Sequence, residues 1–342
     1  VFGARDPEAV EIICYSNSVS LDQRGAAIAE TVDQFVPVIG LSDKDVAGRI
    51  IEDRIDVLVD LAGHTARSRL GVFALKPAPV QASWLGYMAT TGLSAIDYVV
   101  GDPVHTPESF DGHFVEKVAR LPRDLACFVA PDTAIAVAPL PAVQTGRITF
   151  GAFNNPGKMN ERVIALWASI LNDVTGSALL MRYAGCEDAA VQRDFTDRFA
   201  AQGIAPARLS FEGSGNNENV LRAYNRVDIA LDTFPYSGTM TTMEALWMGV
   251  PVVALAGDRM TARQSVAHLT AAGLADLVAS DTDGYRRIAV DLAADPDRLS
   301  ALRTAMRERL LASELMDATG LARALEGAWR SMWQRWCATP RG

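Results

Sequence analysis

The apolar positions of this chain fall into short runs that alternate with segments of helical spacing. In the first half, a run rich in β-branched residues at 55–61 (IDVLVDL) is followed by Gly63 and by a helix-like segment at 66–75. Continuous apolar strands between helices are typical of a parallel sheet covered on both faces. The other elements expected in this half are strands at 10–14, 80–85, 98–100 and 118–121, and a helix at 44–53.

The same alternation restarts near residue 147 and continues to the end of the chain. Repeated strand–helix units of this kind predict a second doubly wound α/β domain. Its expected strands are 147–153, 178–182, 208–211, 228–231 and 250–255, and its expected helices are 160–172, 187–202, 217–224 and 240–248. Amphipathic helices close the chain, the last of them at 321–336.

A proline-rich stretch separates the two halves. Residues 130–145 hold three prolines and one charged residue, which is typical of a connection between domains. We therefore predict a first domain at 1–135, a linker at 136–146 and a second domain at 147–342, whose terminal helix returns to the first domain. The predicted fold is α/β, with two Rossmann-like domains facing a cleft. Ligands of open α/β sheets bind beyond the carboxyl ends of the strands, so we expect the site in that cleft.

The composition excludes several classes of binding partner. The formal net charge is −9 and basic residues form no run, which argues against nucleic-acid binding. Cysteines 14, 127, 186 and 337 form no C-x-x-C pair, which argues against a zinc or disulfide framework and fits a reducing, cytoplasmic location. No apolar run reaches the roughly 18 residues that a membrane span needs, so we expect no membrane partner.

The strongest chemical signal is the segment LDTFPYSGTMTTMEALWMGVP, in which a strand enters a loop and then a hydroxyl-rich helix start. This segment predicts a cradle for a pyrophosphate. The cradle would consist of the Gly238 turn, the backbone amides and the hydroxyls of Thr239, Thr241 and Thr242. Glu244 follows within the helix, where its carboxylate can accept hydrogen bonds from ribose hydroxyls. The alternative is an ordinary capped helix, although three threonines in four positions exceed what capping requires.

A second signal is the segment FGAFNNPGK, which follows a strand and precedes a helix that Asn160 is expected to cap. Lys158 can place a compact positive charge against a phosphate, while Asn154 and Asn155 can bind polar groups. The alternative is a solvated loop lysine.

A third signal is the segment DLAGHT, which places His64 just after a strand end. A histidine there can accept or relay a proton near neutral pH, and the alternative is a structural hydrogen bond. The sequence DTD at 281–283 directly precedes a helical pattern. We interpret it as a helix cap, so we expect no metal site.

Together these segments resemble the catalytic region of the O-GlcNAc transferase and SPINDLY family. The similar motifs are DLAGHT at 60–65, PAPVQ at 77–81, WLGY at 84–87, TTG at 90–92, FGAFNN at 150–155 with Lys158, LDTFPY at 231–236 and ALWMGVP at 245–251. They cover nearly the whole chain in the order of the family.

The resemblance implies a GT-B fold and metal-independent, inverting transfer of GlcNAc from UDP-GlcNAc to Ser or Thr hydroxyls of proteins, without a cofactor. It implies that the first domain lies on the acceptor side and that the second domain binds the nucleotide sugar. It implies that Lys158 stabilises the departing diphosphate and that Thr241, Thr242 and the Gly238 turn hold phosphates. It assigns Glu244 to the ribose and Asn155 to the diphosphate or sugar.

The chain also departs from the family pattern. Met240 interrupts the run of threonines, and Met88-Ala89 replaces the usual Pro-Gly. The family's first strand and helix, which carry another active-site histidine, precede the position that matches Val1, and the tetratricopeptide repeats are absent. We therefore expect an N-terminally truncated first domain. The alternatives are GDP-fucose as donor, transfer of hexose to asparagine, or a non-catalytic nucleotide-sugar-binding module.

Overall fold

The structure, a computed structural model, describes residues 1–339 and divides into two compact units. The first unit contains Val1–Cys127 together with the described residues from Asp317 onward, and the second contains Phe128–Met316. Every sheet in both units is parallel and helices connect most of its strands, although β4 and β5 are joined by a loop. This confirms the predicted α/β class with two Rossmann-like parts.

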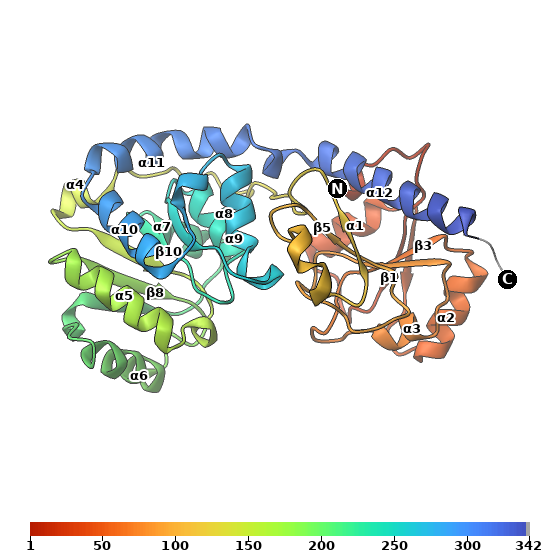
Figure 1. Cartoon of the computed structure of the whole chain (residues 1–342), viewed down its shortest axis with the longest axis horizontal. Coiled ribbons are helices and arrows are strands. Elements are labelled where there is room, and N and C mark those ends of the chain that lie inside the picture. The colour runs from red at the N-terminus through yellow and green to blue at the C-terminus, as the bar shows by residue number, and fades with distance from the viewer. Residues whose placement is uncertain (340–342) are drawn as a thin grey trace. The chain divides into compact units, whose positions relative to one another are not determined.

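The first unit contains a two-stranded sheet, β1-β2, and a four-stranded sheet in the order β3-β4-β5-β6 (Figure 1). A cluster of buried apolar side chains from α2, β3 and α3, including Ile50, Leu58 and Phe73, forms its core. Its elements are η1 (Phe2–Ala4), β1 (Ile13–Ser16), α1 (Gln23–Thr31), β2 (Gln34–Pro37), α2 (Asp43–Glu52), β3 (Val57–Asp60), α3 (Leu70–Ala74), β4 (Val80–Ser83), β5 (Tyr98–Gly101), η2 (Glu108–His113), β6 (Lys117–Arg120) and α12 (Ala318–Ala338).

The second unit is one six-stranded parallel sheet in the order β12-β11-β10-β7-β8-β9. This is the doubly wound Rossmann order, with β7 as the first strand. Its elements are α4 (Pro141–Thr145), β7 (Thr149–Ala152), η3 (Pro156–Lys158), α5 (Glu161–Asp173), β8 (Ala178–Arg182), α6 (Ala189–Ala200), η4 (Pro206–Arg208), β9 (Leu209–Glu212), α7 (Asn217–Tyr224), β10 (Ile229–Leu231), α8 (Met240–Trp247), β11 (Val252–Leu255), η5 (Met260–Ala262), α9 (Gln264–Ala271), η6 (Ala275–Leu277), β12 (Val278–Ala279), α10 (Thr282–Ala293), α11 (Pro296–Leu311) and η7 (Glu314–Met316).

Helix α5 shows why the second unit folds as the sequence pattern suggests. Asn160 caps the helix, because its side-chain oxygen accepts from Arg162 N at 3.0 Å and Val163 N at 3.2 Å, which confirms the expected cap. The apolar stripe of α5 buries Trp167 completely, and the β7 residue Phe150 is also fully buried. The sheet and its covering helix therefore share one apolar core.

The proline-rich stretch expected as a linker lies within the second unit, and part of it forms α4. Asn225 Oδ1 accepts from Ala138 N and Asp228 Oδ1 accepts from Ala142 N, both at 2.8 Å. Arg303 Nε donates to Ala138 O at 2.6 Å. This segment forms no strand, so side chains of the second unit satisfy its backbone N–H and C=O groups instead. The chain changes unit upstream of the expected linker, after Cys127.

The last helix, α12, belongs to the first unit although it ends the chain (Figure 1, blue). Asp6 N donates to Glu326 Oε1 at 2.8 Å, and Arg123 Nη1 pairs with Asp317 Oδ2 at 2.9 Å just before the helix begins. These contacts attach the start and the middle of α12 to the rest of the first unit.

Candidate active site

The strand order of the second unit reverses between β7 and β10. From β7 the chain builds outward to β8 and β9, then returns beside β7 to build β10, β11 and β12. Ligands of doubly wound sheets bind at such a switch point, beyond the carboxyl ends of the strands. The loops that leave β7 and β10 carry Lys158 and the Gly238 turn, so the strand order brings two separate sequence signals to one place.

The turn after β10 presents unsatisfied backbone donors. The N–H groups of Thr239, Met240 and Thr241 make no hydrogen bond within residues 1–339. They lie at the start of α8, where the helix dipole adds partial positive charge. Three consecutive donors at a helix N-terminus are suited to binding an anion such as a phosphate.

The hydroxyl groups of this turn hold it in place rather than capping the helix. Thr239 occupies the N-cap position of α8 without a side-chain cap bond, and its hydroxyl donates instead to Gln264 Oε1. Thr242 Oγ1 lies 2.8 Å from Ser265 Oγ, and Ser265 Oγ donates to Gly238 O at 3.0 Å. The turn is therefore fixed against the first residues of α9.

Lys158 extends to the same turn. Its ammonium donates to Ser237 O at 3.0 Å and lies 3.9 Å from the centre of the Tyr236 ring. Burial lowers the pKa of Lys158, and the negative charge of Asp232 acts in the opposite direction. A half-buried cation beside three available amides is suited to an anionic ligand such as a phosphate.

The two asparagines before Lys158 differ in their environments. Asn154 is buried, and its Nδ2 donates to Asp232 Oδ1 at 3.1 Å. Asn155 is exposed, and its Oδ1 accepts from Gly157 N at 2.9 Å at the start of η3. Asn154 thus supports the turn from the protein interior, whereas the amide of Asn155 lies on the surface.

Glu244 lies within α8, beyond the turn, and is half-buried. Its carboxylate accepts no hydrogen bond from any residue of the described chain. Burial raises the pKa of Glu244 to about 7. The group is therefore an acceptor without a protein partner, which suits it to ribose hydroxyls, and its charge changes near neutral pH.

The sequence interpretation missed Asp232, which directly follows β10. It is 3% exposed, and its Oδ1 accepts from Gly238 N at 2.7 Å as well as from Asn154. The available signal was an acidic residue at the end of a fully apolar strand, where a carboxylate meets the turn that follows.

His64 belongs to the first unit and is exposed. Its Nε2 lies 2.7 Å from Thr91 O, and its ring meets Tyr87 edge-on at 5.1 Å. A carbonyl oxygen only accepts hydrogen bonds, so Nε2 carries the proton and Nδ1 keeps the lone pair in the neutral ring. Buried Glu116 holds Thr91 in place by accepting from its N–H at 2.7 Å.

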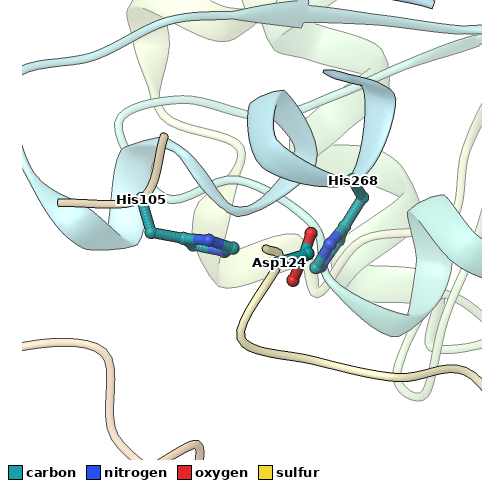
Figure 2. A group of neighbouring side chains, drawn as sticks. All are labelled: His105, Asp124 and His268. Carbon is teal, nitrogen blue, oxygen red and sulfur yellow. The ribbon is translucent and has the colours of Figure 1, made fainter. Parts of the chain in front are cut away.

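Two other histidines, His105 and His268, are buried and are drawn with Asp124 in Figure 2. His105 Nδ1 lies 2.5 Å from Asp102 Oδ2, and Asp102 Oδ1 accepts from His105 N at 2.8 Å, so the pair closes the turn after β5. His268 is part of α9 in the second unit. Each residue has partners within the fold, and we assign no catalytic role to them.

The DTD sequence caps a helix, as predicted. Asp281 is the N-cap of α10, and its Oδ1 accepts from Gly284 N at 2.7 Å. No helix among residues 1–339 combines the length and the apolar character that crossing a membrane demands.

The doubly wound parallel sheet, with a lysine and available amides at its switch point, is the arrangement of a nucleotide-binding α/β protein. The chain belongs to glycosyl transferase family 41, whose family model matches residues 1–135 and 140–325.

Named relatives agree with this assignment. The probable UDP-N-acetylglucosamine–peptide N-acetylglucosaminyltransferase SPINDLY of Oryza sativa subsp. japonica is 38% identical over 332 residues, which cover 96% of this chain and 36% of the relative. The protein SEC of Arabidopsis thaliana, which carries the same probable activity in its name, is 30% identical over 99% of this chain and 35% of its own length. The chain thus spans about a third of the length of these relatives.

A solved structure of an O-GlcNAc transferase from Thermobaculum terrenum is similar to this one with a TM-score of 0.92 at 35% identity. The match covers 98% of this chain and 64% of that chain. A glycosyltransferase from Rickettsia africae shares the fold, with a TM-score of 0.59 at 10% identity.

Proposed function

We propose that this chain is the catalytic part of an inverting, metal-independent glycosyltransferase. It transfers GlcNAc from UDP-GlcNAc to Ser or Thr hydroxyls of a protein. The observation that carries the proposal is the group of three available amides and the Lys158 ammonium at one turn of the second unit, followed by the unpartnered Glu244 carboxylate in α8. This combination suits a nucleoside diphosphate, with phosphates at the amides and ribose at the carboxylate.

In this mechanism the acceptor oxygen attacks the anomeric carbon while the bond from that carbon to the diphosphate oxygen breaks. The electron pair of that bond moves to the diphosphate. Lys158 and the amides of Thr239, Met240 and Thr241 stabilise the growing negative charge. His64, through Nδ1, accepts or relays the proton that the acceptor hydroxyl loses.

Replacement of Lys158 by alanine tests the proposal. Because the charge on the leaving group grows in the transition state, kcat should fall by about a hundredfold or more while the affinity for UDP changes by less than about tenfold. The control is Lys44→Ala, which removes an exposed lysine from α2. Transfer is measured with labelled UDP-GlcNAc and a Ser/Thr-rich peptide. Equal losses in kcat and affinity, or no loss, would contradict the role of Lys158.

A thermal-shift comparison of UDP, GDP and their sugars identifies the donor. A ligand that binds only the folded protein at a hundredfold excess over Kd adds about 2.7 kcal/mol of stability. We expect UDP and UDP-GlcNAc to raise the melting temperature most. Stabilisation by GDP alone would favour GDP-fucose as the donor, and binding of UDP-GlcNAc without turnover would favour a non-catalytic binding module.

A further inference from the structure

A single peptide group joins two charges in the second unit. The carbonyl oxygen of Ser237 accepts from Lys158 Nζ at 3.0 Å, and the N–H of Gly238, in the same peptide, donates to Asp232 Oδ1 at 2.7 Å. The C=O and N–H of a trans peptide point in opposite directions. The ammonium and the carboxylate therefore lie at opposite ends of one peptide dipole, and hydrogen bonds in such a series strengthen one another.

The direction of this peptide decides which amides face a ligand. Gly238 turns its N–H inward to a carboxylate that is 3% exposed, so this amide is not available to a phosphate. The following three amides, of Thr239, Met240 and Thr241, have no partner within residues 1–339. Asp232 is buried on the protein side of the turn. It thus holds the turn in the orientation that leaves those three donors available to a ligand.

The negative charge of Asp232 also favours the protonated form of Lys158. Burial lowers the pKa of Lys158, and the charge of Asp232 counteracts this effect. The other ionisable groups that face Asp232 are Tyr224 of α7 and Tyr285 of α10, and burial raises the pKa of both phenols well above 10, so they stay neutral. Glu244 of α8 acts on Tyr224.

Stability does not explain a carboxylate at this position. Burial raises the pKa of Asp232, and the Ser265 hydroxyl, the Gly238 amide, the Lys158 charge and the Asn154 amide only partly oppose that effect. A buried ionised carboxylate therefore costs folding free energy here. A neutral side chain of the same shape would hold the turn at a lower cost, and the negative charge needs another reason.

We infer that Asp232 is a positioning residue of the donor site. It fixes the Ser237–Gly238 peptide from the protein interior and keeps Lys158 protonated, without touching the nucleotide. The inference rests on the proposed function, in which Lys158 binds the leaving diphosphate. It adds a residue that acts through Lys158 and through the turn.

The variant Asp232→Asn tests this inference, because asparagine keeps an oxygen that accepts from Gly238 N, removes the charge and replaces the other carboxylate oxygen by an amide donor. NMR titration of the Lys158 ammonium is expected to show a midpoint lower by about one pH unit than in the wild-type protein, a tenfold change in the protonation equilibrium. The alkaline limb of the kcat–pH profile should move to lower pH by the same amount.

The matched control is Asp228→Asn. Asp228 precedes the same strand, is fully buried, and accepts from Ala142 N and Thr149 N at 2.8 Å, but it lies at the amino end of β10. It should leave the Lys158 titration unchanged. Should Asp232→Asn fail to fold, Asp232→Ser provides a second neutral acceptor at the same position.

An unchanged Lys158 titration in a folded Asp232 variant would overturn the inference. A lowered titration midpoint together with full transfer activity in Lys158→Ala would support the role of Asp232 and would instead refute the proposed role of Lys158. The two failures are thus distinguishable, because the titration requires no turnover.

Discussion

Replacing Glu244 by glutamine should make the protein more stable and a weaker nucleotide binder. The side chain is half-buried in α8, and its carboxylate accepts no hydrogen bond within the described chain. Burial raises the pKa of this group from 4.5 to about 7 in the folded protein. Glutamine has nearly the same volume and carries no charge, so the substitution removes the desolvation cost while preserving the packing.

The size of the effect follows from the pKa shift. The difference between 4.5 and about 7 is about 2.5 units, and about 1.4 kcal/mol per unit sets an upper bound of about 3 kcal/mol. Contact with solvent reduces this bound, and we expect about 2 kcal/mol. Between pH 4.5 and about 7 the folded protein holds a proton that the unfolded chain has lost, so its stability falls as pH rises through this window.

Urea unfolding at pH 4 and pH 8 measures this effect. Relative to wild type, Glu244→Gln should gain about 2 kcal/mol at pH 8 and nothing at pH 4. The control Glu308→Gln alters an exposed acid on α11 and should change neither value. Calorimetry should show UDP binding to Glu244→Gln at least about tenfold more weakly, because ribose hydroxyls lose a charged acceptor. Identical pH dependence in wild type and variant, or undiminished UDP affinity, would refute the reasoning.

Two further substitutions test the turn and the frame that supports it. Gly238→Ala should weaken UDP binding by more than about tenfold by calorimetry, because a Cβ there would lie 2.6 Å from Thr241 Oγ1 and 2.8 Å from Thr242 Oγ1. Undisturbed binding would show that the turn tolerates a shift. Arg303→Met should lower the free energy of unfolding by about 3 kcal/mol in urea, since the buried guanidinium donates to Ala138 O at 2.6 Å and Val227 O at 2.8 Å. A loss below about 1 kcal/mol would mean that water satisfies these carbonyls.

The sequence pattern predicted the second unit more closely than the first. The expected strand 178–182 and helix 217–224 coincide with β8 and α7. Helix α1 and strand β2 were missed, because α1 buries no residue and both ends of β2 are exposed. Apolar periodicity reports burial, so elements outside the core leave no signal in it. The helix expected at 66–75 shortens to α3, since Arg67 has a left-handed φ of 63°.

The candidate site was predicted as a segment, but the function of each side chain within it was not. Three threonines in four positions look equivalent in sequence, yet Thr239 bonds Gln264 and Thr242 bonds Ser265, which lie 25 and 23 residues further along the chain. Partners at such separation depend on how α9 packs, which local patterning does not encode. The inward direction of the Gly238 amide depends in the same way on Asp232.

Two acids near the donor site, Asp232 before the turn and Glu244 within α8, make the folded protein less stable. Burial raises the pKa of both carboxyl groups, so each makes the folded protein less stable when it is ionised. Yet they act from opposite sides: Asp232 is almost fully buried and bonds the turn, whereas Glu244 is half-buried and bonds nothing within the described chain. A ligand with hydroxyl groups can satisfy only the second carboxylate. Nucleotide binding should therefore offset the destabilisation that Glu244 causes and leave the destabilisation by Asp232 unchanged. This is expected when Glu244 binds the ligand and Asp232 positions the turn.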